Sequence, residues 1–327
     1  MTDETPPSSP GINEPTFGSR EDVTVIIVSF NTRELTLKAI ETLLVKAGAV
    51  SMRVVVWDNA SFDGSADAIA QAFPEIELVR SAENIGFGAA NNRVAETVTS
   101  EWILLLNPDT ETHDRAVENL LAFAKAHPEA GIVGGRTVFP DGSLNTASCW
   151  NRMTVWSLFS SAVGLARIFP HSRFFNSEGI GGWRRDSVRH VDIVVGCFLM
   201  LRAALWRELG GFSDRYFMYG EESDLCLRAA RLGYRPMVTP EAQIMHLVGA
   251  STAKRDDKVV KVLKAKATLI REHWIAPLAP VGIALLWLWG AVRRAGATLR
   301  VLSGGDMDTL VRWKNIWRQR RDWLGGY

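Results

Sequence analysis

The feature that most constrains the fold is the run Trp102-Ile-Leu-Leu-Leu-Asn-Pro-Asp109, where an apolar stretch stops at an amide, a proline and a carboxylate. An uncharged run rich in branched side chains predicts a strand buried on both faces. Pro108 has no N–H to donate to a sheet, so the strand ends before it and Asp109 lies at its carboxyl end. Ligands bind at that edge of open α/β sheets, and a carboxylate there can hold a hard divalent cation. Taken alone, Asn-Pro-Asp favours a plain turn, since all three are turn formers.

Composition excludes several classes of protein. The chain of 327 residues can form one large domain or two ordinary ones. Its 37 Lys+Arg balance 36 Asp+Glu, so we expect no nucleic-acid partner. The three cysteines are scattered and odd in number, which argues against a disulfide framework and fits a reducing compartment. The first 20 residues are rich in Pro and Ser and have no apolar core, so we predict a disordered segment over 1–21 instead of a signal peptide.

Strands and helices alternate over the first hundred ordered residues. Such alternation requires right-handed crossovers and a mostly parallel sheet, which predicts an α/β fold. The predicted strands are Val23–Val28, Met52–Trp57, Ile76–Arg80 and the opening run, and a helical pattern follows each of the first three.

Polar residues follow directly or closely on consecutive predicted strands and should therefore share one rim of the sheet. A strand-end Asp58 is well placed to accept hydrogen bonds from a ribose or a base, and Gly86 allows a ligand to approach the backbone. The spacing Gly86-x-Gly88-x-x-Asn91 nearly matches a dinucleotide fingerprint, but it follows the third strand and ends in Asn, so we set NAD aside. The rim residues are Asn31, Asp58, Asn84 and Asp109.

A second informative stretch runs from Tyr216 through Gly220 to Asp224. Leu225 and later apolar residues continue as a buried helix face, which places Glu221, Glu222 and Asp224 in the first turn of a helix. Acids are expected there because they offset the helix dipole. The helix dipole does not explain the aromatic residues of the preceding loop. Apolar side chains beside a carboxylate keep it partly desolvated, which suits a general base.

Two further positions stand out. Gly196 interrupts the predicted strand Val191–Met200, and a glycine inside a strand often marks close approach by a ligand or another backbone. His246 ends a short predicted strand, where a histidine can bind a metal, although a lone histidine is more often structural. Sequence spacing does not show whether Asp109 and His246 converge.

Two apolar segments suggest a membrane surface. The segment between Trp150 and Gly182 is apolar with basic flanks, which suits a lipid surface or an ordinary packing helix. No charge occurs from Trp274 to Val292, about the length of a bilayer span, and a basic, Trp-rich tail follows. A span would place that basic tail on the side of the membrane opposite the α/β domain, which we expect in a reducing compartment. This arrangement goes against the positive-inside tendency, so we favour an in-plane anchor. A buried helix pair or an oligomer interface is the alternative.

At these residues the chain resembles the family 2 inverting glycosyltransferases of the GT-A fold, and most closely their rhamnosyltransferase-like members. The matching pieces run in family order from about residue 22 to 252. They are Val-Ile-Ile-Val-Ser-Phe-Asn31, Val-Trp-Asp58-Asn-Ala-Ser, Glu-Asn84-Ile-Gly-Phe-Gly, Leu-Leu-Asn-Pro-Asp109, Gly-Gly-Phe-Ser-Asp214, Tyr-Gly-Glu-Glu222-Ser-Asp224-Leu and His246.

The resemblance implies a role for each matching position. Asp109 stands where the family's metal-binding Asp-x-Asp motif ends, and His246 stands where some members add a ligand for Mg²⁺ or Mn²⁺. Glu222 matches the catalytic base, with Glu221 and Asp224 as the neighbouring catalytic candidates. We assign the acceptor side to Gly196, Cys197 and Tyr219. Donor nucleotide binding falls to Ser29, Phe30, Asn31, Asp58, Asn84, Gly86, Phe87, Asn91 and Asn107.

The chain departs from the family pattern at two positions. The metal motif reads Asn107-Pro-Asp109, so its first acid is absent and Asp109 must do most of the coordination. The base position carries Glu222 where Asp is usual, which leaves open whether Glu221 or Glu222 is the base.

The implied reaction is a single displacement with inversion, from a nucleotide-sugar donor to a saccharide acceptor. The resemblance implies TDP-rhamnose as donor and a polyprenyl-diphosphate-linked saccharide as acceptor, in cell-wall or surface polysaccharide synthesis. It also implies a GT-A domain over 22–273. The charge-free run and the basic tail predict a membrane-associating helical region over 274–327 at the cytoplasmic face of the cell membrane, and a possible homo-oligomer through that region. The alternatives are a sugar nucleotidyltransferase and a non-catalytic membrane-bound scaffold.

Overall fold

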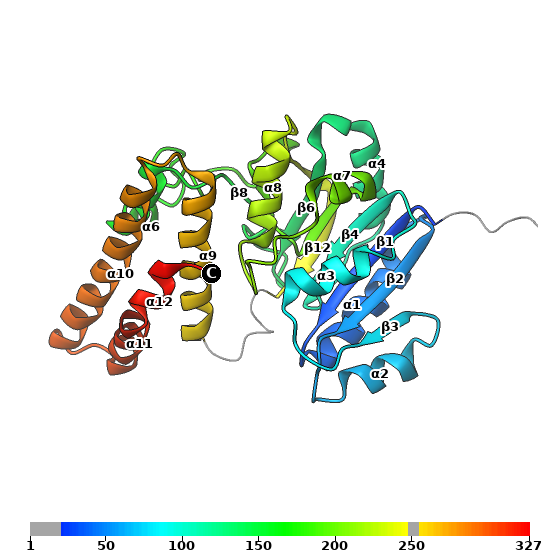
Figure 1. Cartoon of the computed structure of the whole chain (residues 1–327), viewed down its shortest axis with the longest axis horizontal. Helices are drawn as coiled ribbons and strands as arrows, with labels where there is room; N and C mark the ends of the chain where they lie inside the picture. Colours follow the sequence, from blue (N-terminus) through cyan, green and yellow to red (C-terminus); the bar gives the residue numbers. More distant parts are fainter. Residues whose placement is uncertain (1–20, 248–254) are drawn as a thin grey trace, which may run out of the picture.

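A mixed sheet with helices on both faces forms the larger part of the molecule (Figure 1). The structure, a computed structural model, describes residues 21–247 and 255–327. Nearly all of the predicted N-terminal segment 1–21 therefore lies outside the described residues. The main path of the sheet has the strand order β3-β2-β1-β4-β11-β6-β12-β5, with β7 paired to β6 and β9 paired to β12.

Six strands of this main path run in one direction. The parallel pairs are β1 with β2, β1 with β4, β2 with β3, and β6 with β12, whereas β11 lies antiparallel between β4 and β6. The predicted mostly parallel α/β sheet is confirmed. The strands are β1 Val23–Ser29, β2 Met52–Asp58, β3 Glu77–Arg80, β4 Trp102–Leu106, β5 Thr110–Thr112, β6 Ile132–Val138, β7 Leu144–Asn145, β9 Arg189–His190, β11 Phe198–Arg202 and β12 Met237–His246, and a separate pair joins β8 Cys149–Trp150 to β10 Ile193–Val194.

Both faces of β4 are buried, as its sequence predicts. Trp102, Leu104 and Leu106 enter one apolar core, and Ile103 and Leu105 enter the other. Alternation of side chains along a strand sends successive residues to opposite faces, so an all-apolar strand needs helices on both sides. The first core is covered by α1 Arg33–Lys46, α2 Ser65–Ala72 and α4 Ala116–Ala126, and the second by α3 Phe87–Ala95, α7 Ala203–Leu209 and α8 Glu221–Arg231.

A second unit of helices lies beside the sheet (Figure 1). Its core buries Leu158 of α5, Ile270 of α9, Leu286 of α10 and Trp323 of α12. Thus α9, which precedes residue 274, packs together with the helices that follow it. The elements are α5 Val155–Ala162, α6 Leu165–Ile168, α9 Arg255–His273, α10 Ala279–Leu302, α11 Met307–Arg318 and α12 Arg320–Gly325.

The charge-free segment 274–292 does not form one continuous helix. The chain leaves α9 at His273, and α10 begins at Ala279 with Pro280 in its first turn, where a missing N–H costs no helical hydrogen bond. Among the described helices, none has the length and apolar character needed to cross a bilayer.

Candidate active site

The carboxyl ends of β1, β2 and β3 bring the predicted donor residues to one rim. Ser29 of β1 pairs in register with Asp58 of β2, and Asp58 pairs with Arg80 of β3. The Asp58 carboxylate is buried, and its Oδ2 accepts a hydrogen bond from the Ser61 amide at 3.1 Å. Its Oδ1 is buried and has no hydrogen-bond partner among the described residues. A buried carboxylate oxygen without a partner, at the edge of the sheet where ligands bind, can accept a hydrogen bond from an N–H or O–H group of a bound molecule.

Two asparagines hold the loops of this rim. Asn31 adopts a left-handed conformation (φ 52°), and its Oδ1 accepts from the Phe62 amide at 2.9 Å. Asn84 Oδ1 accepts from the Gly86 amide and from Asn59 Nδ2, both at 3.0 Å. Asn59 was missed in the sequence, although it directly follows Asp58. These side chains fix loop shape, which positions the backbone of the rim.

The turn after β1 has one buried and one exposed side chain. Ser29 Oγ is buried and shares hydrogen bonds with the hydroxyls of Thr32 and Thr36 at 3.1 and 2.9 Å. Ser29 therefore stabilises the turn through buried hydrogen bonds and does not face a ligand. Phe30 is exposed and meets the Phe62 ring edge-to-face, with centroids 6.2 Å apart. Of the two, only Phe30 presents a surface to a ligand.

The glycine loop before α3 packs against the loop that precedes α8. The Phe87 amide donates to the Phe217 carbonyl at 3.2 Å. A Cβ at Gly86, whose φ is +87°, would lie 2.5 Å from that same oxygen, so only glycine fits. Asn91 is fully buried, and its Nδ2 donates back to the Phe87 carbonyl at 2.9 Å. The donor loop and the loop carrying the aromatic residues therefore touch directly.

Asp109 and His246 converge, although they lie far apart in the sequence. β5 pairs antiparallel with β12, which sets His246 opposite Thr110. His246 Nε2 and Asp109 Oδ1 are 3.3 Å apart, and both side chains are buried. The Leu247 amide donates to the Asp109 carbonyl at 3.0 Å and secures the junction. This juxtaposition is produced by strand pairing, which the local sequence does not reveal.

Cys197 and Asn107 border this pair. The Asn107 amide donates to the Cys197 carbonyl at 3.1 Å, so the metal-motif segment is tied to the chain beside β11. Burial alone would lower the pKa of His246, but Cys197 and Asp109 beside the ring outweigh it and raise the pKa to about 10. His246 Nδ1 is buried without a hydrogen-bond partner among the described residues.

Gly196 lies beside Glu222. A Cβ at Gly196 would lie 3.5 Å from the Phe87 ring and 3.8 Å from the Glu222 Cβ. Because Cys197 borders His246, the dipeptide Gly196-Cys197 extends from the base candidate to the Asp109–His246 pair. Predicted donor, acceptor and base residues therefore meet here.

The two glutamates differ in their surroundings. Glu222 is half-buried, whereas Glu221 is buried with its Cβ near Gly88, and its Oε2 has no hydrogen-bond partner among the described residues. Burial raises the pKa of both carboxyls, and the neighbouring Glu222 charge raises that of Glu221 further. Of the two side chains, that of Glu222 is the more accessible.

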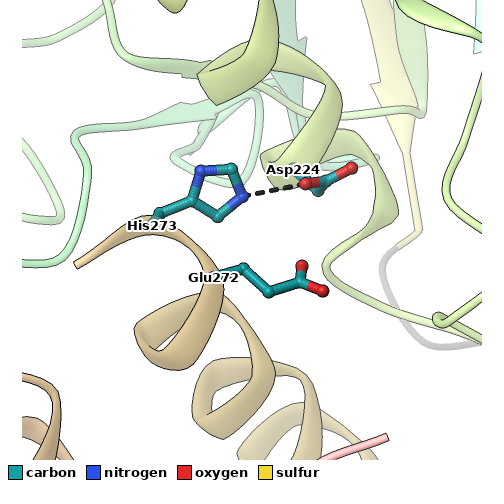
Figure 2. Close-up of side chains that lie close together, drawn as sticks. All are labelled: Asp224, Glu272 and His273. Carbon is teal, nitrogen blue, oxygen red and sulfur yellow. Dashed lines mark hydrogen bonds and ion pairs between the residues drawn. The ribbon is translucent and has the colours of Figure 1, made fainter. Parts of the chain in front are cut away.

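Asp224 and Tyr219 face other groups. Asp224 Oδ2 accepts from Arg228 Nε at 2.7 Å. Its Oδ1 lies 2.8 Å from His273 Nε2, and Figure 2 draws this contact as a dashed line. Its carboxylate is thus engaged with α8 and α9 and is not brought together with the groups around Gly196. Tyr219 adopts φ 69° immediately before α8, and Lys258 of α9 lies 5.9 Å from its ring centroid.

Comparison with known proteins identifies the family. The sequence profile of glycosyl transferase family 2 matches residues 24–208, more than half of the chain. The chain belongs to glycosyl transferase family 2. The matched region ends before α8, so α8, α9, α10, α11 and α12 lie outside it.

Relatives of this family 2 glycosyltransferase include rhamnosyltransferases. N-acetylglucosaminyl-diphospho-decaprenol L-rhamnosyltransferase of Mycobacterium tuberculosis is 28% identical over 213 residues, which cover 62% of this chain and 68% of the relative. Rhamnosyltransferase WbbL of Escherichia coli is 27% identical over 240 residues, which cover 68% of this chain and 83% of the relative. The resemblance to the rhamnosyltransferase-like members is confirmed.

Solved structures support the GT-A fold of this glycosyltransferase. The mannosyltransferase PcManGT from Pyrobaculum calidifontis, solved with GDP-Man and Mn²⁺, aligns with a TM-score of 0.54 at 19% identity, covering 94% of this chain and 84% of that chain. TarS of S. aureus aligns with a TM-score of 0.52 at 14% identity, covering 93% of this chain and 49% of that chain. The predicted fold class is confirmed.

Proposed function

We propose that this glycosyltransferase is inverting and moves rhamnose from TDP-rhamnose to a saccharide carried on polyprenyl diphosphate, in cell-wall or surface polysaccharide synthesis. The names of the two rhamnosyltransferase relatives support the donor sugar, and that of the mycobacterial relative supports the lipid-linked acceptor. One observation carries the mechanism: Gly196-Cys197 separates the half-buried Glu222 from the Asp109–His246 pair. A base and a site for the donor diphosphate therefore flank one point of the rim.

The reaction needs a base because the acceptor hydroxyl is weakly acidic. Glu222 takes the hydroxyl proton as the acceptor oxygen bonds to the anomeric carbon, and the bond from that carbon to the nucleoside diphosphate breaks. Attack from the face opposite the leaving group inverts the anomeric configuration. Burial suits Glu222 to this role, because a raised pKa strengthens a carboxylate as a base.

Asp109 and His246 fit a divalent metal ion. Adjacent ligands of an octahedral ion at about 2.1 Å lie about 3 Å apart, and His246 Nε2 and Asp109 Oδ1 are 3.3 Å apart. A carboxylate oxygen and a neutral imidazole nitrogen are both suitable donors for Mn²⁺, so binding through His246 releases the ring proton, and the oxygen suits Mg²⁺. When bound, the ion would stabilise the charge that develops on the leaving diphosphate. Asp109 and His246 would hold it, while Asp58 contacts the nucleoside.

Turnover by the purified full chain tests the proposal. TDP-rhamnose or a UDP-sugar is supplied with Mg²⁺ or Mn²⁺ and an N-acetylglucosaminyl-diphospho-polyprenol acceptor. We expect transfer from TDP-rhamnose, with the product's anomeric configuration, read by NMR, opposite to that of the donor. Retention of configuration would contradict the inverting mechanism, and transfer from a UDP-sugar alone would contradict the donor.

A lipid-linked acceptor requires access to a membrane, and α10 offers a surface for it. Apolar residues on its outward side are exposed, with Val281 42%, Val292 37%, Leu299 66% and Leu302 79% accessible. At 100° per residue these four fall on one stripe of the helix. Residues 274–327 carry eight Lys or Arg against three Asp, a balance that favours anionic lipid and disfavours a second copy of the same surface. We place this surface on the cytoplasmic face, where the donor is available.

Charged substitutions on that stripe should release the protein from vesicles. We expect Val292→Glu with Leu299→Glu to reduce co-flotation with phosphatidylglycerol vesicles at least about fivefold, because burying each carboxylate in the interface is costly. Val45→Glu, on the exposed side of α1, is the matched control and should float like the parent. Unchanged flotation, or dissociation of a dimer by the double variant, would instead favour an oligomer interface.

A further inference from the structure

The segment that leads into α8 contains two successive residues in a left-handed conformation. Tyr219 and Gly220 adopt φ 69° and 93°, and α8 begins without a side-chain cap because its first flanking residue is glycine. A left-handed conformation at a tyrosine costs free energy and persists only where surrounding contacts impose it. Glu222 lies in the first turn of this helix, so whatever holds the segment also holds the base.

The helical unit supplies those contacts through α9 and Tyr327. Tyr216 Oη donates to Glu272 Oε2 at 2.9 Å, and Tyr327 Oη donates to the Met218 carbonyl at 2.6 Å. The Tyr327 amide in turn donates to Thr268 Oγ1 of α9 at 2.8 Å. The loop ahead of Glu222 is therefore bound at two successive points by residues that belong to the other unit.

The backbones also approach closely at the start of α8. A Cβ at Gly220 would lie 3.0 Å from the Ala265 Cβ and 3.0 Å from the Tyr216 ring. Tyr216, Ala265 and Leu269 form a small buried cluster of their own, separate from the two sheet cores and from the core of the helical unit. The contact between the units is therefore a joint between independent cores.

His273 and Glu272, at the end of α9, complete the joint (Figure 2). His273 binds Asp224 in the first turn of α8, and both side chains are buried. Burial would raise the pKa of Asp224, but the hydrogen bond from His273 and the Arg228 charge outweigh it and lower the pKa. Arg228 also donates to the Gly211 carbonyl at 2.7 Å, which connects the same acid to the loop after α7.

Asp224, Glu272 and His273 lie close enough together to hold a metal ion, but their charges are already compensated. Arg228 pairs with Asp224 at 2.7 Å, and Arg215 pairs with Glu272 at 3.2 Å. These two arginines and Arg231 line the same open cavity of about 460 Å³ between α8 and α9. Because arginine side chains already neutralise the two carboxylates, the cluster is better suited to linking the two helices than to binding a metal cation.

We propose that Glu272, His273 and Tyr327 are positioning residues, through which the helical unit fixes the first turns of α8 and thereby sets Glu222 against Gly196. The inference rests on the proposed role of Glu222 as the base. The helical unit would then position the catalytic base in addition to presenting the proposed membrane-binding surface. None of the three touches the reacting groups, so their effect passes through the loop and α8.

Tyr327→Phe and His273→Leu test the joint in the full chain. Tyr327→Phe removes one oxygen and keeps the ring, and we expect kcat to fall about tenfold, because small displacements of a catalytic group are costly. His273→Leu should do the same, and His273→Gln, which can still donate to Asp224, should recover most of kcat. Tyr234→Phe and His127→Leu, outside the joint, are the matched controls and should behave like the parent.

Three readouts separate positioning from simple stability. Nucleotide affinity, measured by calorimetry, should be unchanged in the joint variants. The acid limb of the pH–kcat profile should move to lower pH, because a loosened loop hydrates Glu222 and lessens the burial that raises its pKa. The melting temperature reports the fold itself.

The possible failures are distinguishable. Parent-like kcat and pH profile in both joint variants, with Glu222→Gln inactive, would overturn the joint and leave the proposed function standing. A fall in kcat matched by equal losses of nucleotide binding and melting temperature would also overturn it, because the joint would then only stabilise the fold. Full activity of Glu222→Gln would remove the base on which both rest.

Discussion

Glu222→Gln is expected to lower kcat by about 10²- to 10⁴-fold while nucleotide affinity stays within about twofold of the parent. Glutamine keeps the size of the side chain but accepts no proton, so the acceptor hydroxyl is left without its base. Glu222 lies beside Gly196 and is half-buried, whereas the proposed nucleoside contact, Asp58, lies at the end of β2. Steady-state kinetics together with calorimetric titration of TDP measure the two effects.

Glu221→Gln is the matched comparison for this variant. Glu221 lies one residue away on the same helix turn, but its side chain is buried against the start of α3. We expect its effect on kcat to be less than about tenfold. If Glu221→Gln were the inactive variant and Glu222→Gln the active one, the assignment of the base would be reversed.

The pH dependence follows from the raised pKa of Glu222. The base works only when ionised, so activity should rise with pH through a pKa above the ordinary value of 4.5, and Glu222→Gln should lose this limb. The raised pKa of Glu222 affects the stability of the fold in the opposite direction: raising the pH increases activity but lowers stability. A carboxyl whose pKa is raised by folding binds its proton more tightly in the folded state, so its ionisation destabilises the fold above the ordinary pKa. Glu222→Gln should therefore melt no lower than the parent at neutral pH.

Local patterns in the sequence predict the parts of this structure that local forces determine. The all-apolar run Trp102–Leu106 is a strand covered on both faces, and α2 Ser65–Ala72 forms where a helical pattern follows the second predicted strand. Strand ends at Asp58 and Asp109 are likewise visible, because a strand's apolar pattern and its terminating proline or turn lie within a few residues. Local sequence patterns are therefore enough to predict the rim that carries the donor-side residues.

Long-range pairing determines the rest. Asp109 meets His246 because β5 pairs with β12, and neither strand carries a signal that names its partner. The joint between Asp224 and His273 joins two helices with separate cores, and in sequence Asp224 is indistinguishable from an ordinary acid at a helix start. The different surroundings of the three acids of α8 are visible only in the folded structure.

Asp109→Asn is expected to weaken Mn²⁺ binding at least about 100-fold, measured by calorimetry in the presence of TDP. Asparagine keeps the volume of the side chain and a hydrogen-bond acceptor for His246, but it removes the charge that attracts the ion. His246→Asn should weaken binding as well, by less, because imidazole contributes no charge when it coordinates. Asp114→Asn, whose side chain is 87% exposed, is the matched control. Parent-like Mn²⁺ affinity in Asp109→Asn would place the metal elsewhere.

The absence of the first acid of the metal motif leads to a further prediction about Mn²⁺ binding. With Asn107 in place of an acid, Asp109 supplies the one carboxylate of the motif, so the ion should bind weakly alone and more tightly when a nucleotide diphosphate adds its oxygens. Asn107→Asp should raise Mn²⁺ affinity in the absence of nucleotide and narrow the difference that TDP makes. The backbone of Asn107 is already fixed, since its amide donates to Cys197 and its carbonyl accepts from Thr110, so the substitution changes charge without moving the chain. An unchanged affinity would mean that position 107 does not face the ion, and that the loss of its acid has no consequence for metal binding.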